Sequence, residues 1–520
     1  MPDRKISVSL VGLNPGGAHS TNLYLLQSFA YQNLEVKKHV DIKIHFFDLL
    51  IPAQSNGLDV IMRTILDDQS DIYGFSCYCW NIIQVLELTK VMKSIYADKQ
   101  IFLGGPEVSA HCKTLLHDND QIDFILKGEG ELAFLKMMEY CIGLEKQISR
   151  VNNLVYRKNG EIVENEELQL ECLEQIPPLF SSGLIDMDLL GESLYSFETK
   201  RGCQYRCDYC FHHKGSHVIR EYPLEYVKKE LDVLLHSKLK YIWFTDPCFN
   251  ENQERSIKII KYIVENNIYN IEFGFELRNE TLSEEFIQEL SKIKSIRFVA
   301  MGLQTLTKEA LEIVHRDFQK QIFERNMQLI RKYFSKNVRI HVDLIYGLPG
   351  DTLEGYMRSV DYVIAMDGII FTQPLKVLPG TTLEENIDQY HMHVNPYPPY
   401  EVLYHDTFSF EDMNEVKKIN LGIYLFQADD RICQSFKKIA KIKDKPYSMI
   451  FQEVGNYFWD QKMYDLFRNY LQFSFGYLAG IVRDCFQALY QIEVDFSDED
   501  GQDRVIQLDW GSVAKQEFSK

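Results

Sequence analysis

Residues 200–211 read KRGCQYRCDYCF, and the cysteines in this stretch, Cys203, Cys207 and Cys210, follow the spacing CxxxCxxC. Three thiolates on one short loop can hold three irons of a 4Fe–4S cluster and leave the fourth iron open. A zinc site is the alternative, because His212 and His213 follow closely enough to supply a fourth ligand. We favour the cluster, since the neighbouring motifs also fit it.

The composition of the 520-residue chain limits its partners and its compartment. The 75 acidic residues outnumber the 56 lysines and arginines, and the net charge of −19 argues against nucleic acid as the main partner. No uncharged apolar run approaches the roughly 18 residues that a membrane-spanning helix needs. Eleven cysteines, in a chain whose first residues do not resemble a signal peptide, predict reduced thiols. We therefore expect a cytoplasmic protein that binds neither nucleic acid nor membranes.

Strand-like runs alternate with helical periodicity throughout residues 1–145. Five β–α units of this kind predict a doubly wound parallel sheet, an α/β fold whose ligand crevice lies outside the carboxyl ends of the strands. The predicted strands cover residues 5–13, 41–49, 71–78, 100–105 and 123–128, and the predicted helices cover 20–32, 59–68, 81–96 and 131–140.

The loops after these strands form the predicted ligand crevice. They are rich in glycine and polar residues, as in the runs GGPE and GEGE. A glycine at a strand end by itself indicates only a tight turn, so neither run is a strong signal alone. The candidate binding residues in these loops are Asn14, Gly16, Gly17, Ser76, Tyr78, Trp80, Asn81, Gly104, Gly105, Glu107, Gly128, Glu129 and Gly130.

A predicted connector, residues 146–190, precedes a second α/β domain. It contains a predicted hairpin over residues 153–165, because Asn159-Gly160 favours a type I′ turn. Six further strands alternate with helices in residues 191–385, and we place the chemistry at their carboxyl ends, as in α/β barrels. These strands are predicted at 193–202, 240–247, 270–278, 296–304, 339–350 and 372–380.

The last part of the chain, residues 386–520, is predicted to be mainly helical. Apolar residues between Met413 and Phe426 recur at helical spacing. The stretch 451–477 is rich in aromatic residues, which indicates the core of a helical domain. A lid or substrate wall over the mouth of the second domain is the alternative for this stretch.

In this order, the GGPE and GEGE loops, the CxxxCxxC loop and the later strand ends resemble the cobalamin-dependent radical SAM enzymes. The resemblance implies a Rossmann-like cobalamin-binding domain, a partial (β/α)6 radical SAM barrel and a C-terminal helical domain. It also implies that the candidate binding residues of the first-domain loops, Glu129 among them, contact the corrin of cobalamin. It also implies three cofactors, which are a 4Fe–4S cluster, S-adenosylmethionine (SAM) and cobalamin. The Asp-x-His-x-x-Gly motif of many cobalamin domains does not occur here, so the lower cobalt ligand stays unassigned.

The resemblance also implies SAM contacts at the strand ends of the barrel. The family pattern places contacts to the amino group, the ribose or carboxylate, and the adenine at successive strands and beside the third cysteine. For each residue an ordinary ion pair or hydrogen bond is the alternative. In this sequence, the residues at these positions are Tyr209, Asp246, Glu276, Arg278, Gln304 and Leu378. Arg316 matches an arginine that braces this region in the family. Cys248 lies beside the end of the second strand, and we interpret it as a buried, inert thiol.

The activity that the resemblance implies is radical methylation. The reduced cluster would cleave SAM to methionine and a 5′-deoxyadenosyl radical, which would remove a hydrogen from an unactivated carbon, and methylcobalamin would then supply the methyl group. The expected partners are a small-molecule or peptide substrate and an electron donor such as flavodoxin or ferredoxin. The alternatives are a cobalamin-assisted rearrangement or cyclisation without methyl transfer, and a non-catalytic cobalamin or redox sensor. Methylthiotransfer would need a second cysteine triad, which Cys77 and Cys79 alone do not supply.

The first prediction concerns the cysteine loop. Protein reconstituted without oxygen should hold about four irons and four sulfides per chain. Replacing Cys203, Cys207 and Cys210 together by Ala should abolish the visible absorbance of the cluster and all SAM cleavage, because no thiolate of the loop remains to bind iron. A triple variant that keeps its iron would show that other residues are the ligands.

Overall fold

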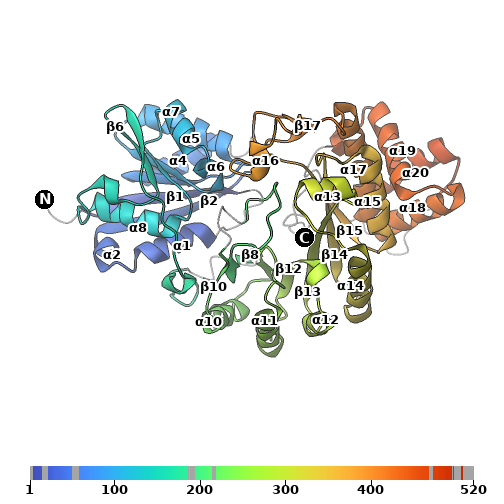
Figure 1. Ribbon diagram of the computed structural model, residues 1–520, viewed down its shortest axis with the longest axis horizontal. Helices are drawn as coiled ribbons and strands as arrows, with labels where there is room; N and C mark the ends of the chain where they lie inside the picture. Colours follow the sequence, from blue (N-terminus) through green and yellow to red (C-terminus); the bar gives the residue numbers. More distant parts are fainter. Residues whose placement is uncertain are drawn as a thin grey trace.

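The computed structural model shows two α/β domains followed by a mainly helical C-terminal region (Figure 1). It describes residues 4–14, 21–49, 58–185, 187, 194–212, 218–467, 472–494, 496 and 505–507. The first sheet lies on the left of Figure 1, the second sheet in the centre and the C-terminal helices on the right. Within these ranges the structure has no helix with both the length and the apolar character needed to cross a membrane.

The first sheet has the order β2-β1-β3-β4-β5-β6-β7, and its first five strands are parallel. Buried apolar residues line both of its faces, since Val8 and Leu10 of β1 belong to one core cluster and Val11 and Leu13 to another. The expected doubly wound sheet is therefore confirmed. Its parallel strands are β1 (Ile6–Asn14), β2 (Val40–Asp48), β3 (Ile72–Ser76), β4 (Gln100–Gly104) and β5 (Phe124–Leu126).

Helices cover both faces of this sheet. The side chains of α1 (Thr21–Ala30), α2 (Leu34–His39) and α8 (Gly130–Cys141) join one core cluster. Those of α4 (Leu58–Asp67), α5 (Ile82–Ile95) and α7 (Cys112–Asp118) join the other, and the short helix α6 (Pro106–Ser109) follows β4.

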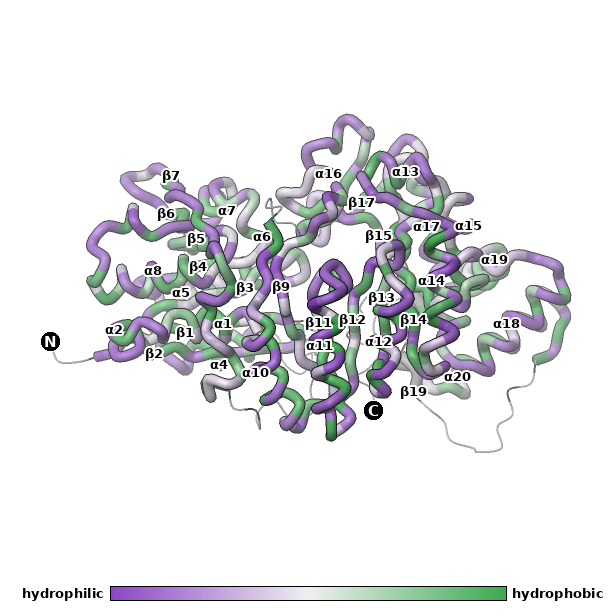
Figure 2. Tube along the Cα trace, turned by 60° about the horizontal axis from the view of Figure 1, so that its bottom comes forward, coloured by the Kyte–Doolittle hydropathy of each residue, from purple (hydrophilic) through white to green (hydrophobic). Residues whose placement is uncertain are grey.

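The predicted Asn-Gly hairpin is present and belongs to the first sheet. Asn159 and Gly160 have φ values of 52° and 84°, as a type I′ turn requires. They join β6 (Leu154–Lys158) to β7 (Glu161–Glu164), and β6 pairs antiparallel with β5. Figure 2 shows hydrophilic residues along this hairpin, which suits an edge strand that must not pair with other chains.

The second sheet has the order β15-β14-β13-β12-β11-β8, so six parallel strands follow one another in sequence, as expected for a partial barrel. Its strands are β8 (Leu194–Phe197), β11 (Tyr241–Phe244), β12 (Glu272–Leu277), β13 (Ile296–Gln304), β14 (Arg339–Tyr346) and β15 (Ile369–Pro374). The helices that follow them are α10 (Leu224–Leu235), α11 (Gln253–Asn266), α12 (Glu284–Leu290), α13 (Lys308–Ile313), α14 (Lys320–Tyr333) and α15 (Leu353–Ala365).

The sixth strand differs from its predicted range of 372–380. β15 begins at Ile369, because the β-branched and aromatic run that starts there suits a strand, and it ends at Pro374. Beyond Leu375 the chain leaves the sheet, and the Val377 amide donates to the Tyr400 carbonyl. The predicted second half of the strand therefore pairs with a distant segment of the chain.

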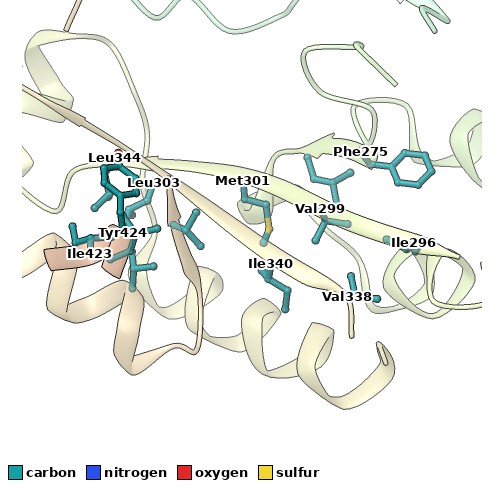
Figure 3. Close-up of a cluster of buried hydrophobic side chains, with 14 of the residues drawn as sticks. Phe275, Ile296, Val299, Met301, Leu303, Val338, Ile340, Leu344, Ile423 and Tyr424 are labelled. Atoms are coloured by element: carbon teal, nitrogen blue, oxygen red, sulfur yellow. The ribbon is translucent and has the colours of Figure 1, made fainter. Parts of the chain in front are cut away.

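The C-terminal helices pack on the outside of the barrel. Figure 3 shows Val299, Met301 and Leu303 of β13 in one layer that continues to Ile423 and Tyr424 of α17. The aromatic-rich stretch supplies Phe451, which is buried against Phe426 and Phe436. These contacts favour the helical core. The elements are α17 (Phe410–Ala428), α18 (Asp430–Lys443), α19 (Tyr447–Asp460) and α20 (Phe475–Tyr490), with the short elements α16 (Thr382–Glu385), β16 (His393–Val394), β17 (Val402–Tyr404), β18 (Gln472–Ser474) and β19 (Val505–Gln507).

The contact between α17 and α19 requires a glycine. A Cβ atom added at Gly422 would lie 2.5 Å from the Cα atom of Phe451. We expect Gly422→Ala to lower the free energy of unfolding by about 1–3 kcal/mol, because the two helices must move apart. In the control variant Gly480→Ala, the added atom meets only Arg483, at 3.8 Å. Because Ala favours a helix more than Gly does, this variant should raise the free energy of unfolding by up to about 1 kcal/mol. Thermal melting followed by circular dichroism compares the two, and equal melting temperatures would contradict the packing argument.

Candidate cofactor site between the two sheets

The cysteine loop begins after β9 (Lys200–Arg201), close to the carboxyl end of β8. Cys203 and Cys207 are 9% and 6% exposed, and Cys210 is half-buried. The His212 amide donates to the Cys210 Sγ atom at 3.5 Å. Burial raises the pKa of the Cys203 thiol and raises that of Cys210 to about 12, so both thiols need a cation to hold them as thiolates.

The donor set of this loop fits a 4Fe–4S cluster. In the described ranges, which include His212 but not His213, no three His, Cys, Asp or Glu side chains gather closely enough to share one metal ion. A 4Fe–4S cluster has a different requirement, because each cysteine binds its own iron. Three partly or fully buried thiols on one loop meet that requirement.

Two carboxylates on the segment after β11 hold the first half of the loop. Asp246 is 1% exposed, and it accepts hydrogen bonds from the Thr199 amide (2.7 Å), the Thr199 hydroxyl (2.6 Å) and the Lys200 amide (3.1 Å). Glu251 accepts from the Gln204 amide at 3.0 Å and forms a buried ion pair with Lys200. Burial raises the pKa of Asp246 to about 6. Both oxygens of Asp246, a predicted SAM contact, therefore hold the base of the loop.

Arg316 lies against the second half of the loop. Its Nη1 atom is 3.9 Å from the Cys207 Sγ atom, and its Nη2 atom donates to the Gly302 carbonyl. A guanidinium at this position brings a positive charge and hydrogen-bond donors next to the sulfur atom. Sequence analysis assigned Arg316 only a bracing role, and the structure places its charge beside a predicted iron ligand.

Arg278, another predicted SAM contact, is engaged in contacts within the protein. Its guanidinium stacks over the Tyr205 ring at 4.4 Å, pairs with Glu280 at 3.0 Å and donates to the Asp317 carbonyl at 2.5 Å. Cys248, near the start of the loop, is 2% exposed, and burial raises its thiol pKa to about 12, which agrees with an inert thiol.

Unpartnered polar atoms gather where β13 and β14 approach this loop. The Gln304 Oε1, Asp343 Oδ1 and Arg316 Nε atoms are buried and have no hydrogen-bond partner within the described part of the protein. Gln304 has a φ of 71°, and the register between the two strands shifts between Gly302 and Gln304. Buried polar atoms normally have partners, so this set fits a polar ligand such as SAM.

Glu276 and Leu378 complete the predicted SAM set, together with Tyr209. Burial, with Asp343 and Asp246 nearby, raises the pKa of Glu276 to about 8. Tyr209 packs against the apolar cluster that contains Leu375 and Val377, and Leu378 follows that cluster in the chain. A Cβ atom at Gly380 would lie 3.2 Å from the Phe211 ring, so the segment after β15 lies against the cysteine loop.

The predicted crevice of the first domain lies at the ends of β1 and β3, the switch point of the sheet. Asn81 spans this point, because its Nδ2 atom donates to the carbonyls of Leu13 (3.0 Å) and Ser76 (2.9 Å), and its Oδ1 atom accepts from the Tyr78 amide (2.8 Å). Its side chain therefore shapes the crevice through the backbone. Asn14 lies at the end of β1, next to these groups.

Asn22 is a crevice residue that sequence analysis did not identify. Its Nδ2 atom donates to the Ser76 hydroxyl at 2.9 Å and to the Tyr78 hydroxyl at 3.1 Å. The Tyr78 ring stacks on Trp80 at 4.3 Å, and Trp80 is 45% exposed. The sequence pointed to Asn22 only through its position shortly after the loop that follows the first strand. Gly16 and Gly17, predicted here, lie outside the described residues.

The GGPE loop requires its glycines. The Cys77 amide donates to the Gly104 carbonyl at 2.8 Å, and Gly105 has a φ of 111° and faces the Cys77 carbonyl closely. Glu107 is buried, which raises its pKa, and it accepts a hydrogen bond from the Tyr400 hydroxyl.

The GEGE loop contacts the second domain. Gly128 has a φ of 69°, and Gly130 lets α8 approach Leu26 of α1. The carboxylate of Glu129 is bound by Arg220, and the adjoining Glu131 is bound by Arg201. The sequence analysis did not identify either arginine. The sequence pointed to them only because one lies before the cysteine loop and the other after it.

Comparison with known proteins relates both domains to described families. The Radical SAM superfamily matches residues 197–363, the B12 binding domain family matches residues 34–137, and a family of unknown function (DUF4080) matches residues 388–477. The cobalamin-dependent radical SAM methyltransferase TokK of Streptomyces tokunonensis is 22% identical over 77% of this chain, and the chain spans 60% of TokK.

Two solved structures have a similar fold. The radical SAM methyltransferase TsrM of Kitasatospora setae, with cobalamin and a [4Fe–4S] cluster bound, has a TM-score of 0.61 and 18% identity over 76% of this chain and 78% of TsrM. The cobalamin-dependent SAM radical enzyme OxsB, with aqua-cobalamin and SAM bound, has a TM-score of 0.63 and 17% identity over 95% of this chain and 78% of OxsB.

The third prediction uses the raised pKa of Glu276. The fold disfavours the charged carboxylate, so stability should fall as pH rises from the unfolded pKa to the folded pKa of about 8, and should then level off. The variant Glu276→Gln has no carboxyl group at this position, so this loss of stability with rising pH should be absent from it. In cofactor-free protein, we expect its gain in melting temperature over the parent to grow between about pH 5 and pH 8 and to stay constant above. The control Glu254→Gln, at a side chain that is 84% exposed, should give a flat difference over the same range. A flat difference for Glu276→Gln would contradict the argument.

Proposed function

We propose that this chain is a cobalamin-dependent radical SAM enzyme that methylates an unactivated carbon of a small molecule or peptide. The observation that carries the proposal is the placement of two sites side by side. The cysteine loop and the carboxyl-end loops of the first sheet are joined directly, through the ion pair of Arg201 with Glu131. Radical formation and methyl supply can then act on one substrate.

When bound, the cluster supplies the electron that cleaves SAM, and cobalamin carries the methyl group. The chain's own residues would bind the cofactors and orient the substrate. Cys203, Cys207 and Cys210 would hold the irons of the cluster, and Arg316 would offset negative charge at Cys207. Gln304 presents a buried acceptor to SAM.

The segment after β15 contacts both the first domain and the cysteine loop, because Gly380 lies against Ala110 and Phe211. Tyr400 donates to Glu107 at the end of β4, and His111 pairs with Glu384 at 2.7 Å. Figure 1 shows α16, which contains Glu384, between the first domain and the rest of the chain. These contacts would help to keep the first domain and the barrel in a fixed arrangement around a substrate.

The proposed chemistry requires an electron donor and a reducing compartment. A one-electron donor of the flavodoxin or ferredoxin type is needed to reduce the cluster. The structure describes eleven cysteines, all with free thiols. We place the protein in the cytoplasm, where such thiols would stay reduced.

The products of SAM test the proposal. Methylation consumes two SAM molecules per product, and we expect S-adenosylhomocysteine and 5′-deoxyadenosine in near-equal amounts when substrate is converted without oxygen. Chromatography with mass detection measures both. Product formed with 5′-deoxyadenosine and no S-adenosylhomocysteine would instead show rearrangement or cyclisation. No 5′-deoxyadenosine after reduction with dithionite would indicate a sensor.

A further inference from the structure

Two arginines beside the cysteine loop face two carboxylates of the first domain. Arg201 of β9 and Arg220 of β10 (Arg220–Glu221) are directly paired in a two-stranded antiparallel ribbon. Glu129 and Glu131 belong to the GEGE loop at the start of α8. We call these four residues the clasp. All four side chains are only 6–8% exposed.

The bonds within the clasp are directional. Arg220 binds Glu129 through two bonds, Nη1 to Oε2 at 2.9 Å and Nη2 to Oε1 at 2.5 Å. Arg201 donates through Nη2 to Glu131 at 2.6 Å, and its Nη1 atom is 3.6 Å from Glu129. A two-bond arginine–carboxylate pair fixes orientation as well as distance, because both groups are planar.

Further contacts anchor each arginine on the barrel side. Arg220 Nη1 donates to the Leu170 carbonyl at 2.6 Å, and Arg201 Nε donates to Glu198 at 2.9 Å. Burying four charges requires desolvating them, so such a network is weak evidence for stability and better suited to specifying geometry.

The clasp connects the cobalamin-binding domain to the cysteine loop by a short path. Arg201 precedes Cys203 by two residues, and Glu129 follows β5 by three. We propose that these four residues are positioning residues that set the distance and orientation of the cluster relative to cobalamin. The proposal rests on the proposed function. It assigns Glu129 to this contact in place of the contact with the corrin that sequence analysis predicted.

The test measures the distance between the two cofactors. The full chain is reconstituted with iron, sulfide and hydroxocobalamin and then reduced, so that both cob(II)alamin and the cluster carry an unpaired electron. Their magnetic coupling in electron paramagnetic resonance depends on separation and orientation. We expect a defined coupling in the parent protein, and a shifted or broadened coupling in Glu131→Gln at unchanged iron and cobalamin content. A role in folding alone would not change this signal.

Two further variants sharpen the result. Arg220→Lys keeps the charge but loses the two-bond pair, so it should broaden the coupling even if Glu131→Gln fails to fold. The control Glu139→Gln removes a glutamate of the same helix α8 that pairs with Lys136 inside the first domain, and its coupling should match the parent.

The possible outcomes are distinct. An unchanged coupling in folded Glu131→Gln and Arg220→Lys would overturn the clasp. Loss of cobalamin from Glu131→Gln or Arg220→Lys, with the cluster intact, would also overturn it and would indicate a direct contribution to cobalamin binding. A parent protein that binds no cobalamin would instead refute the proposed function.

Discussion

The buried ion pairs between the GEGE loop and the β9–β10 ribbon are the constraint on which the arrangement of the two domains depends. The first sheet has two apolar cores of its own, and the core of the barrel also reaches the first domain, because Phe29 of α1 joins it. Apolar packing is not directional, whereas the paired bonds of Arg220 and Glu129 are. Because Arg201 lies two residues before Cys203, the same bonds that join the domains also fix the base of the cysteine loop.

A second connection on another part of the chain limits rotation about the first. After β15 the chain returns to the first domain, where Tyr400 binds Glu107 and Glu384 binds His111. A single contact would leave the domains free to rotate, but two contacts at separate points do not. The carboxyl end of β4 and the segment after β15 are therefore held together at a second point.

Local patterns in the sequence predicted most of the fold, and pairings between distant residues account for what they did not predict. Strand and helix periodicity located both sheets, since it depends only on neighbouring residues. The end of β15 was misplaced because Val377 pairs with Tyr400, which no local pattern shows. Glu129 was placed in the crevice because it follows a strand, while its partner Arg220 is 91 residues away. For the same reason, sequence analysis gave no indication that both oxygens of Asp246 would be occupied by Thr199 and Lys200.

The charges around the cysteine loop explain how an acidic protein can hold a cluster that adds further negative charge. Lys200, Arg201 and Arg278 each form an ion pair with a carboxylate, so they add little net positive charge. Arg316 differs, because it forms no ion pair with a carboxylate in the part of the chain that the structure describes. Its guanidinium also interacts electrostatically with Glu280 and Asp343, and it brings a positive charge to 3.9 Å from the Cys207 sulfur, whereas exposed charges more than about 10 Å away are largely screened. Local pairing at the loop, and not the overall charge of the protein, therefore sets the electrostatic environment of the cluster.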